Sequence, residues 1–187
     1  MDFILDYIDG LKKAIVALEP DRIRHLAELL INENEKGKAI FLCGNGGSAA
    51  CASHIANDLA KLTIIPNHRR FQVIALTDNI PLLTAWANDN GYEHCFVEPL
   101  KNLYKEGDVL IGISGSGNSK NVLNAVEFMN NNRGVTIGLT GLTGGKLATL
   151  AKNVIQVRSD NMQIIEDVHV AIGHLICSYI YHIFMRK

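Results

Sequence analysis

Residues 38–48, with the sequence KAIFLCGNGGS, give the clearest indication of how this chain folds. The run from Lys38 to Cys43 is almost entirely apolar, and glycine follows it directly. A short apolar run that ends in turn residues is typical of a strand buried on both faces, as in a parallel sheet. A helical pattern begins at once and covers residues 47–62. The segment therefore predicts a buried strand, a glycine-rich turn and a helix in direct succession.

The same unit of strand and helix recurs along the rest of the chain. Further short, β-rich runs lie at residues 71–76, 108–113, 135–139 and 153–157. Besides residues 47–62, helical stretches are predicted at about 80–104, 119–132, 145–151 and 161–186. Alternating helices and short apolar strands predict an α/β domain whose parallel sheet is covered by helices on both faces.

Two further helices are predicted before the first strand, within residues 2–36. Pro20 and Asp21 interrupt the first helical pattern and mark the start of the second helix. At roughly 150 residues per domain, we expect residues 1–187 to form one domain, with 1–36 as an N-terminal helical extension. The first helix has an apolar face made of Phe3, Ile4, Tyr7, Ile8 and Leu11. Such faces usually mark a contact between subunits, so we expect the extension to pack in an oligomer.

Composition and charge exclude several classes of protein. The 18 Lys and Arg residues nearly balance the 19 Asp and Glu residues, which argues against direct binding of nucleic acid. Hydrophobic residues make up 48% of the chain, which is typical of a globular rather than a disordered protein. No uninterrupted apolar run reaches the roughly 18 residues of a membrane helix, and the acidic N-terminus is unlike a signal peptide. The four dispersed cysteines form no CxxC pair, so we expect a reduced, cytoplasmic protein.

Two glycine- and hydroxyl-rich loops follow the first and third predicted strands, where parallel sheets form their ligand sites. The first loop, Gly44-Asn45-Gly46-Gly47-Ser48, formally matches the dinucleotide fingerprint, with Asp78 in the place of the ribose-binding acid. However, Asp78 lies well beyond the spacing of about 20 residues that is usual for that acid. A tight turn that needs glycine for a positive φ is the simpler explanation.

The second loop, Ser114-Gly115-Ser116-Gly117-Asn118-Ser119, is the stronger candidate for a phosphate site. Three hydroxyls and two glycines at the start of a helix offer side-chain and backbone donors to one phosphate monoester. A helix cap is the alternative, but Asn118 or Ser119 alone would supply it. The three serines therefore favour phosphate binding.

Four ionisable side chains are candidates for acid–base chemistry or metal binding. His54 and Asp58 are four residues apart in the helix after the glycine loop, so they share a face. Glu166 and His174 are about 80° apart around the last helix, so both can face one cleft, whereas His169 points well away from His174. Such a set can supply a general acid and base, or bind a divalent metal such as zinc. Taken singly, each residue is better explained as an exposed or internally satisfied polar group.

At these residues the chain resembles the sugar isomerase (SIS) domain family, and its phosphoheptose isomerase branch in particular. The motifs follow the family's order and spacing: Gly44-Asn45-Gly46-Gly47-Ser48 with His54 and Asp58, Asn88-Asp89, Gly112-Ile113-Ser114-Gly115-Ser116-Gly117-Asn118-Ser119, and Glu166-Asp167-Val168-His169 with His174. The resemblance implies a three-layer αβα sandwich with a five-stranded parallel sheet of flavodoxin-like type. It also implies a homotetramer with active sites between subunits.

The resemblance further implies roles for individual residues. The phosphate loop falls on Ser114, Gly115, Ser116 and Ser119, and the sugar-binding residues fall on Asn45, Gly46, Gly47, Ser48, Asn88, Asp89 and Glu166. Members of this branch bind zinc at positions that correspond to His54, Asp58, Glu166 and His174. In the same comparison, Asp58 corresponds to the catalytic base and His174 to the acid.

Two departures from the family pattern affect this site. Asp58 replaces a Glu and is one methylene shorter, and Glu166 replaces a neutral Gln. The added charge favours a divalent cation, although two carboxylates that share one proton are the alternative. Gly115, in place of the usual Thr of the serine loop, is a smaller change.

The leading hypothesis is an aldose–ketose isomerase that converts sedoheptulose 7-phosphate to D-glycero-D-manno-heptose 7-phosphate through an enediolate. The alternative, motivated by Asp58 and Glu166, is a non-catalytic SIS module that binds a phosphosugar and contacts a protein partner, as the replication-initiator-associating members do. A nucleotide-dependent oxidoreductase is the third hypothesis, and it predicts that the protein binds NAD.

Overall fold

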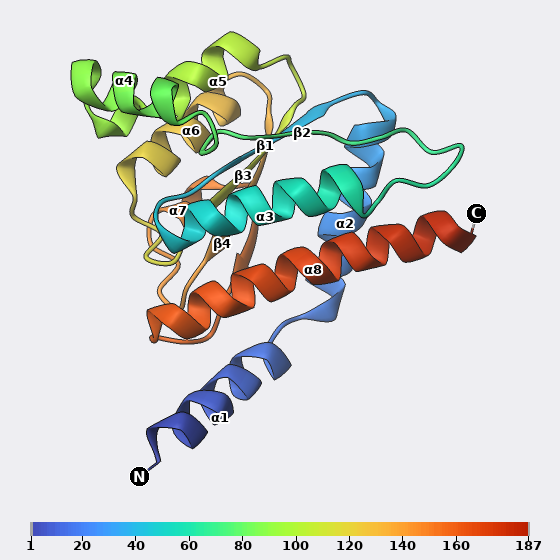
Figure 1. Cartoon of the computed structure of the whole chain (residues 1–187), viewed down its shortest axis with the longest axis vertical. Coiled ribbons are helices and arrows are strands. Elements are labelled where there is room, and N and C mark those ends of the chain that lie inside the picture. Colours follow the sequence, from blue (N-terminus) through green and yellow to red (C-terminus); the bar gives the residue numbers. More distant parts are fainter. Residues whose placement is uncertain (1, 187) are drawn as a thin grey trace.

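Five short strands form one parallel sheet in the order β2-β1-β3-β4-β5 (Figure 1). The computed structural model describes residues 2–186. The strands are β1 Ala39–Cys43, β2 Gln72–Ala75, β3 Val109–Ser114, β4 Val135–Thr140 and β5 Asn153–Gln156. All five predicted strands are therefore present, and the predicted three-layer α/β architecture with a five-stranded parallel sheet is confirmed.

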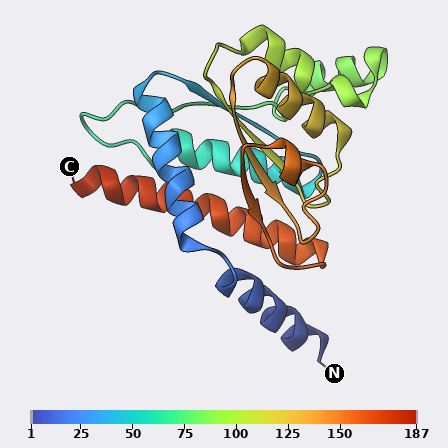
Figure 2. The ribbon, with the colours of Figure 1, turned by 180° about the vertical axis from the view of Figure 1, so that it is seen from behind.

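Helices cover both faces of this sheet because successive side chains of each strand point to opposite faces. In β1, Ile40 and Leu42 join the core formed with α2, α3 and α8, whereas Phe41 and Cys43 join the core formed with α5, α6 and α7. Figure 2 shows the molecule from behind, with α2 lying across α8. The helices are α1 Phe3–Val16, α2 Pro20–Glu35, α3 Gly47–Lys61, α4 Ile80–Asn90, α5 Val97–Leu103, α6 Lys120–Asn131, α7 Leu147–Leu150 and α8 Met162–Arg186, with the 3₁₀ turn η1 Tyr92–His94.

The single helical stretch predicted at about 80–104 is wrong, because the chain divides there into α4, η1 and α5. Gly91 ends α4 with φ +102°, a conformation that residues with a side chain rarely adopt. None of the residues of α4 is buried, and the helix projects from the body of the molecule (Figure 1). The break therefore turns the chain back toward the sheet after an exposed helix.

The extension formed by α1 also projects from the body in both views (Figures 1 and 2). The Tyr7 hydroxyl donates a 2.6 Å hydrogen bond to Asp167 of α8, and Ala14 is buried. Most of the apolar face remains uncovered, since Phe3, Ile4 and Ile8 are each more than half exposed. The predicted apolar face of the first helix is therefore present on the surface of the chain.

Helix α8 is long and apolar enough to cross a membrane, judged by length and composition alone. It nevertheless packs along α2 and α3, and ten of its residues are buried in the domain core. This packing accounts for its apolar character, because a core helix of a folded domain also buries one whole face.

Candidate functional site

The two predicted ligand loops meet at one edge of the sheet. The chain passes from β1 to β2 on one side and then returns to β3 on the other side of β1, so β1 and β3 lie next to each other. This reversal of strand order creates a crevice at the carboxyl ends of the two strands, where α/β proteins bind ligands. A pocket of about 250 Å³ lies there, lined by Asn45, Ser48, Ile113, Ser114, Gly115, Ser116, Ser119, Met162 and Glu166.

The glycine loop allows α8 to approach α3 closely at this pocket. Gly46 has φ +55°, and α3 begins directly after it at Gly47. A Cβ atom at Gly47 would collide with the carboxylate of Glu166. The absence of a side chain at Gly47 therefore leaves room for the Glu166 carboxylate at the start of α3.

The serine loop gathers its three hydroxyls in the same pocket. The Ser114 Oγ lies 3.0 Å from the Ser119 Oγ and 3.5 Å from the Ser116 Oγ. Ser119 occupies the N-cap position of α6, but its side chain makes no capping hydrogen bond. Asn118 does not cap α6 either, since its Oδ1 accepts from the backbone N–H of Lys146. The helix-cap alternative therefore does not explain these side chains.

Met162 is a lining residue that the sequence analysis did not single out. A Cβ atom at Gly115 would collide with the Met162 sulfur, so the methionine occupies the room of a side chain at position 115. Met162, at the start of α8, thus fills space that the side chain of the usual Thr would need at position 115.

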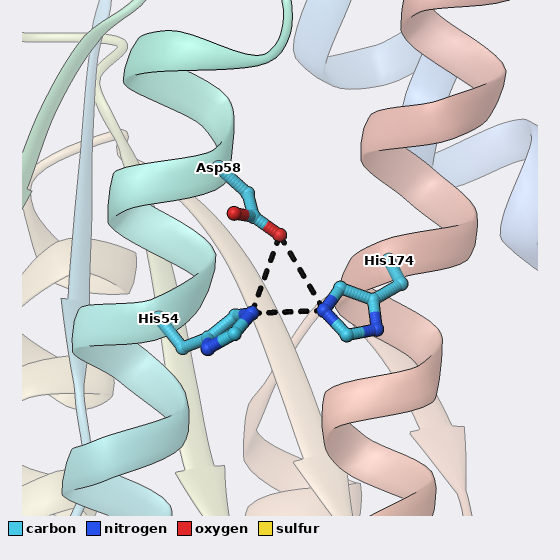
Figure 3. A group of neighbouring side chains, drawn as sticks. All are labelled: His54, Asp58 and His174. Atoms are coloured by element: carbon cyan, nitrogen blue, oxygen red, sulfur yellow. Dashed lines mark hydrogen bonds and ion pairs between the residues drawn. The ribbon is translucent and has the colours of Figure 1, made fainter.

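A second group of predicted residues lies further along α3 and α8, where His54, Asp58 and His174 face one another (Figure 3). The two His Nε2 atoms are 2.8 Å apart, and they lie 3.4 Å and 3.6 Å from the Asp58 Oδ2. Close helix packing produces this contact, because a Cβ at Gly173 would collide with Ile55, the neighbour of His54. The predicted shared face of His54 and Asp58 is thus present, and His174 completes it.

The donor set and its spacing fit a metal ion. Ligand atoms at the corners of a tetrahedron with bonds of about 2.0–2.1 Å are about 3.3 Å apart, and the three separations here are 2.8, 3.4 and 3.6 Å. Asp58 Oδ2 is buried and, within residues 2–186, accepts no hydrogen bond. Such a buried oxygen calls for a partner that the protein itself does not supply.

Glu166 lies apart from the other three members of the predicted set of four metal ligands in this structure. It is eight residues from His174 along α8, a rise of about 12 Å, and its carboxylate lies against Gly47 in the serine-loop pocket. In this structure it therefore joins the predicted substrate-binding residues and not the group of His54, Asp58 and His174. Asp58 lies with His54 and His174, whereas Glu166 lines the serine-loop pocket, which opposes the alternative in which the two carboxylates share a proton.

Asn88 and Asp89 do not line the pocket in this structure. Both are exposed near the end of α4, and the Asn88 amide donates a 2.8 Å hydrogen bond to Asp89. Asp78 is no free ribose-binding acid, because its carboxylate accepts hydrogen bonds from Ser53 and Thr77. The dinucleotide hypothesis therefore gains no support from the site.

None of the four cysteines is a candidate nucleophile. All are free and buried, and burial raises the pKa of Cys51 and of Cys177 to about 12. These two thiols are therefore protonated at neutral pH, and the thiolate is the reactive form.

His169 points away from His174, as predicted, and is fully buried against β4. One ring nitrogen lies 3.3 Å from the Thr140 carbonyl oxygen, and burial lowers the pKa of His169 from 6.5 to about 4. The unfolded chain then binds more protons than the native state between these two values, so stability falls as pH drops from about 6.5 to about 4.

We expect this pH dependence to be weaker in His169→Gln, which keeps a side-chain donor without a titrating ring. At most about 3.5 kcal/mol of the wild-type loss belongs to His169, because each pKa unit corresponds to about 1.4 kcal/mol. Urea unfolding at several pH values between 4 and 7 measures the difference. Parallel pH profiles for the variant and the wild type would contradict the assignment.

Comparison with known proteins identifies the family. A model of the SIS domain matches residues 5–141, which covers more than half of the chain. The chain belongs to the SIS domain family. The match includes the glycine loop, His54, Asp58 and the serine loop, whereas Glu166 and His174 on α8 lie beyond it.

Full-length relatives extend this SIS assignment to α8 and to the phosphoheptose isomerase branch. A phosphoheptose isomerase from Aneurinibacillus thermoaerophilus is 39% identical over 191 residues, which covers 100% of this chain and 96% of the relative. The phosphoheptose isomerase structure from Neisseria gonorrhoeae has a TM-score of 0.85 at 33% identity and covers 95% of this chain and 94% of its own. The one from Francisella tularensis has a TM-score of 0.88 at 31% identity and covers 96% of both chains. The resemblance inferred from the motifs is confirmed.

Proposed function

We propose that this SIS protein is an aldose–ketose isomerase that converts sedoheptulose 7-phosphate to D-glycero-D-manno-heptose 7-phosphate. The observation that carries the proposal is that α3 and α8 connect two features: both helices line the hydroxyl-rich pocket of the serine loop, and further along they carry the group of the buried carboxylate Asp58 with His54 and His174. Relatives that match over 90% and 100% of the chain are named phosphoheptose isomerases, which supports the same reaction here.

In this proposal the serine loop binds the phosphate and Asp58 and His174 move the protons. Asp58 removes a proton from C1 of the ketose while His174 protonates the C2 carbonyl oxygen, which gives an enediol or enediolate. Return of a proton to C2 and loss of the proton on the C1 oxygen then complete the aldose. Binding energy from the remote phosphate positions C1 and C2 for these transfers.

The distance along α3 between the serine-loop pocket and the His54–Asp58–His174 group supports a long substrate. His54 is seven residues beyond Gly47, a rise of about 10 Å along the helix. An extended seven-carbon sugar phosphate has a comparable length, so one molecule can reach from the serines to the His54–Asp58–His174 group. A five-carbon ketose phosphate is too short for both contacts.

Proton NMR of the purified protein with sedoheptulose 7-phosphate in D₂O tests this function. We expect an aldose product that carries solvent deuterium at C2, and much slower turnover of ribulose 5-phosphate. Tight binding of sedoheptulose 7-phosphate without any exchange of the α-proton would contradict the proposed isomerase function and would favour a non-catalytic phosphosugar-binding module.

We further propose zinc, one ion per subunit, as the metal of the His54–Asp58–His174 group. Two imidazole nitrogens and one carboxylate oxygen are ligands that zinc prefers, and a set of three leaves a position for substrate. When bound, zinc would supply a Lewis acid for the carbonyl oxygen in place of the proton from His174, because a ligating Nε2 carries no proton.

Adding zinc to metal-free protein should raise the Tm. At 100 times the dissociation constant the stabilisation is about 2.7 kcal/mol, which corresponds to roughly 5–10 °C for a chain of this size. His54→Ala should abolish the shift, whereas His94→Ala, at a histidine outside the group, should keep it. Elemental analysis without bound metal, together with an unchanged Tm, would exclude the metal site.

We also propose that the protein is a homotetramer whose active sites lie between subunits. Besides the exposed face of α1, an apolar groove of about 490 Å³ runs between the end of α1, α2 and α8 and includes Ile15, Val16, Leu175 and Tyr179. The His54 and His174 side chains are 47% and 51% exposed, so a second subunit can reach them.

Deletion of residues 1–17 should therefore break the assembly and lower the activity with it. Light scattering coupled to size exclusion measures the change in mass. Tyr7→Phe serves as the control, because it removes the internal hydrogen bond to Asp167 and keeps the apolar face. A truncated protein that stays tetrameric and active would contradict this arrangement.

We place this enzyme in the cytoplasm, where its four free cysteines stay reduced. The near-neutral net charge supports a small sugar phosphate, rather than nucleic acid, as the ligand.

A further inference from the structure

The side chain of Asn45 in the serine-loop pocket is held by a network that the reaction does not use. Its Nδ2 donates a 2.9 Å hydrogen bond to the Asn121 Oδ1, and its own Oδ1 accepts a 2.8 Å bond from the Asn121 Nδ2. The Tyr92 hydroxyl donates a further 2.9 Å bond to the Asn45 Oδ1. Asn121 is 2% exposed, so this reciprocal pair of amides is buried on the Asn121 side.

A backbone donor determines which way these amides point. The N–H of Val122 can only donate, so the Asn121 atom that it meets at 3.0 Å is the oxygen. The Asn121 Nδ2 must then donate, and it does so to the Asn45 Oδ1 and to the Cys95 sulfur at 3.3 Å. The Asn45 oxygen consequently accepts two hydrogen bonds, from Asn121 and Tyr92, which occupies both of its lone pairs.

One hydrogen-bonding group of Asn45 is left for a ligand. Of its two amide hydrogens, one is used by Asn121, and within residues 2–186 the second meets no acceptor. Asn45 lines the serine-loop pocket. It therefore offers the pocket a donor and no acceptor.

We infer that Asn121 and Tyr92 are positioning residues that hold Asn45 as a hydrogen-bond donor toward an oxygen atom of the sugar phosphate. This inference rests on the proposed function for the identity of the ligand. Because Asn45 offers only a donor, the substrate group beside it must accept a hydrogen bond. A hydroxyl, carbonyl or phosphate oxygen can accept, whereas an ammonium group can only donate and would face the Asn45 donor unpaired. The arrangement thus selects oxygen over an amino substituent at the position next to Asn45.

Asn121→Asp tests the inference with a nearly isosteric change. It replaces the donor that faces the Asn45 oxygen with a second oxygen, so the Asn45 amide must turn away or flip. We expect the KM for sedoheptulose 7-phosphate to rise roughly tenfold, with kcat within about twofold, because a lost ground-state contact affects binding uniformly. Tyr92→Phe, at a half-exposed side chain, should raise KM by roughly threefold with an unchanged Tm.

Asn124→Asp is the matched control. Asn124 lies on the same helix, and its Nδ2 donates to the Glu93 carbonyl oxygen at 3.1 Å, so it also ties α6 to η1 without contacting Asn45. Its KM should equal that of the wild type. An equal rise in KM for Asn124→Asp would show that docking of η1 matters and not the polarity of Asn45, and would overturn the inference.

The remaining outcomes are also decisive. A wild-type KM in folded Asn121→Asp and in Tyr92→Phe would overturn the inference, and Tyr92→Phe decides alone if Asn121→Asp does not fold. If the wild type binds sedoheptulose 7-phosphate without converting it, the proposed function fails. Dissociation constants from calorimetry then replace KM in the same comparison and still test the role of Asn45.

Discussion

Asp58→Asn should lower kcat for sedoheptulose 7-phosphate by about 10³-fold, since loss of a general base typically costs 10²–10⁴-fold. The side chain is buried between His54 and His174, and its Oδ2 faces both imidazoles. Asparagine keeps the shape but accepts no proton, and it is a much poorer metal ligand. Steady-state kinetics, together with circular dichroism to verify folding, measures the effect.

Asp58→Glu is the informative control for this change. The resemblance implies Glu at this position, so the longer carboxylate should keep kcat within about tenfold of the wild type. Loss of activity in both variants would indicate that the fit of Asp58 between the two histidines matters more than its basicity. Wild-type activity in Asp58→Asn would remove Asp58 from the mechanism altogether.

Ser116→Ala should weaken sugar-phosphate binding by roughly ten- to a hundredfold, because a charge-assisted hydrogen bond contributes about 1.5–3 kcal/mol. Ser119→Ala should do the same without destabilising α6, since the Ser119 hydroxyl faces Ser114 and does not cap the helix. Calorimetric titration with sedoheptulose 7-phosphate gives the affinities, and thermal unfolding gives the stability.

Ser159→Ala is the matched control for the serine loop. The Ser159 hydroxyl accepts from the Asn161 N–H in the turn before α8, and the residue does not line the pocket. Its affinity for sugar phosphate should stay at the wild-type value. If Ser116→Ala and Ser119→Ala both bind as tightly as this control, the phosphate lies elsewhere.

The sheet and its two loops were predictable because their signals are local. Apolar runs such as Lys38–Cys43 are long enough for a buried strand, and the glycines and serines that follow them place the loops at one edge. The break of the stretch at about 80–104 is harder to predict, because an isolated glycine such as Gly91 is tolerated inside a helical pattern as well as being typical of a helix end.

Helical spacing predicts which site residues share one face of a helix, but it does not predict contacts between distant parts of the chain. Spacing placed His54 and Asp58 on one face, but the angle around α8 does not include the rise between Glu166 and His174, so it could not show that Glu166 lies in the serine-loop pocket of this structure, apart from the three other predicted ligands. Asn121 and Tyr92 carry no signal of their own, because their role depends on a contact with Asn45 across distant parts of the chain.

Helix α8 presents Glu166 to the serine-loop pocket and His174 to the group with His54 and Asp58, so the rise of this helix sets the distance between the two proposed contacts with the ligand. Side chains on one face of a helix recur about every 5 Å, with each turn. A related protein could therefore change the length of its preferred substrate in coarse steps, by moving a functional residue one turn along α8. Finer steps would come from the length of a side chain, since Asp and Glu at one position differ by a single methylene.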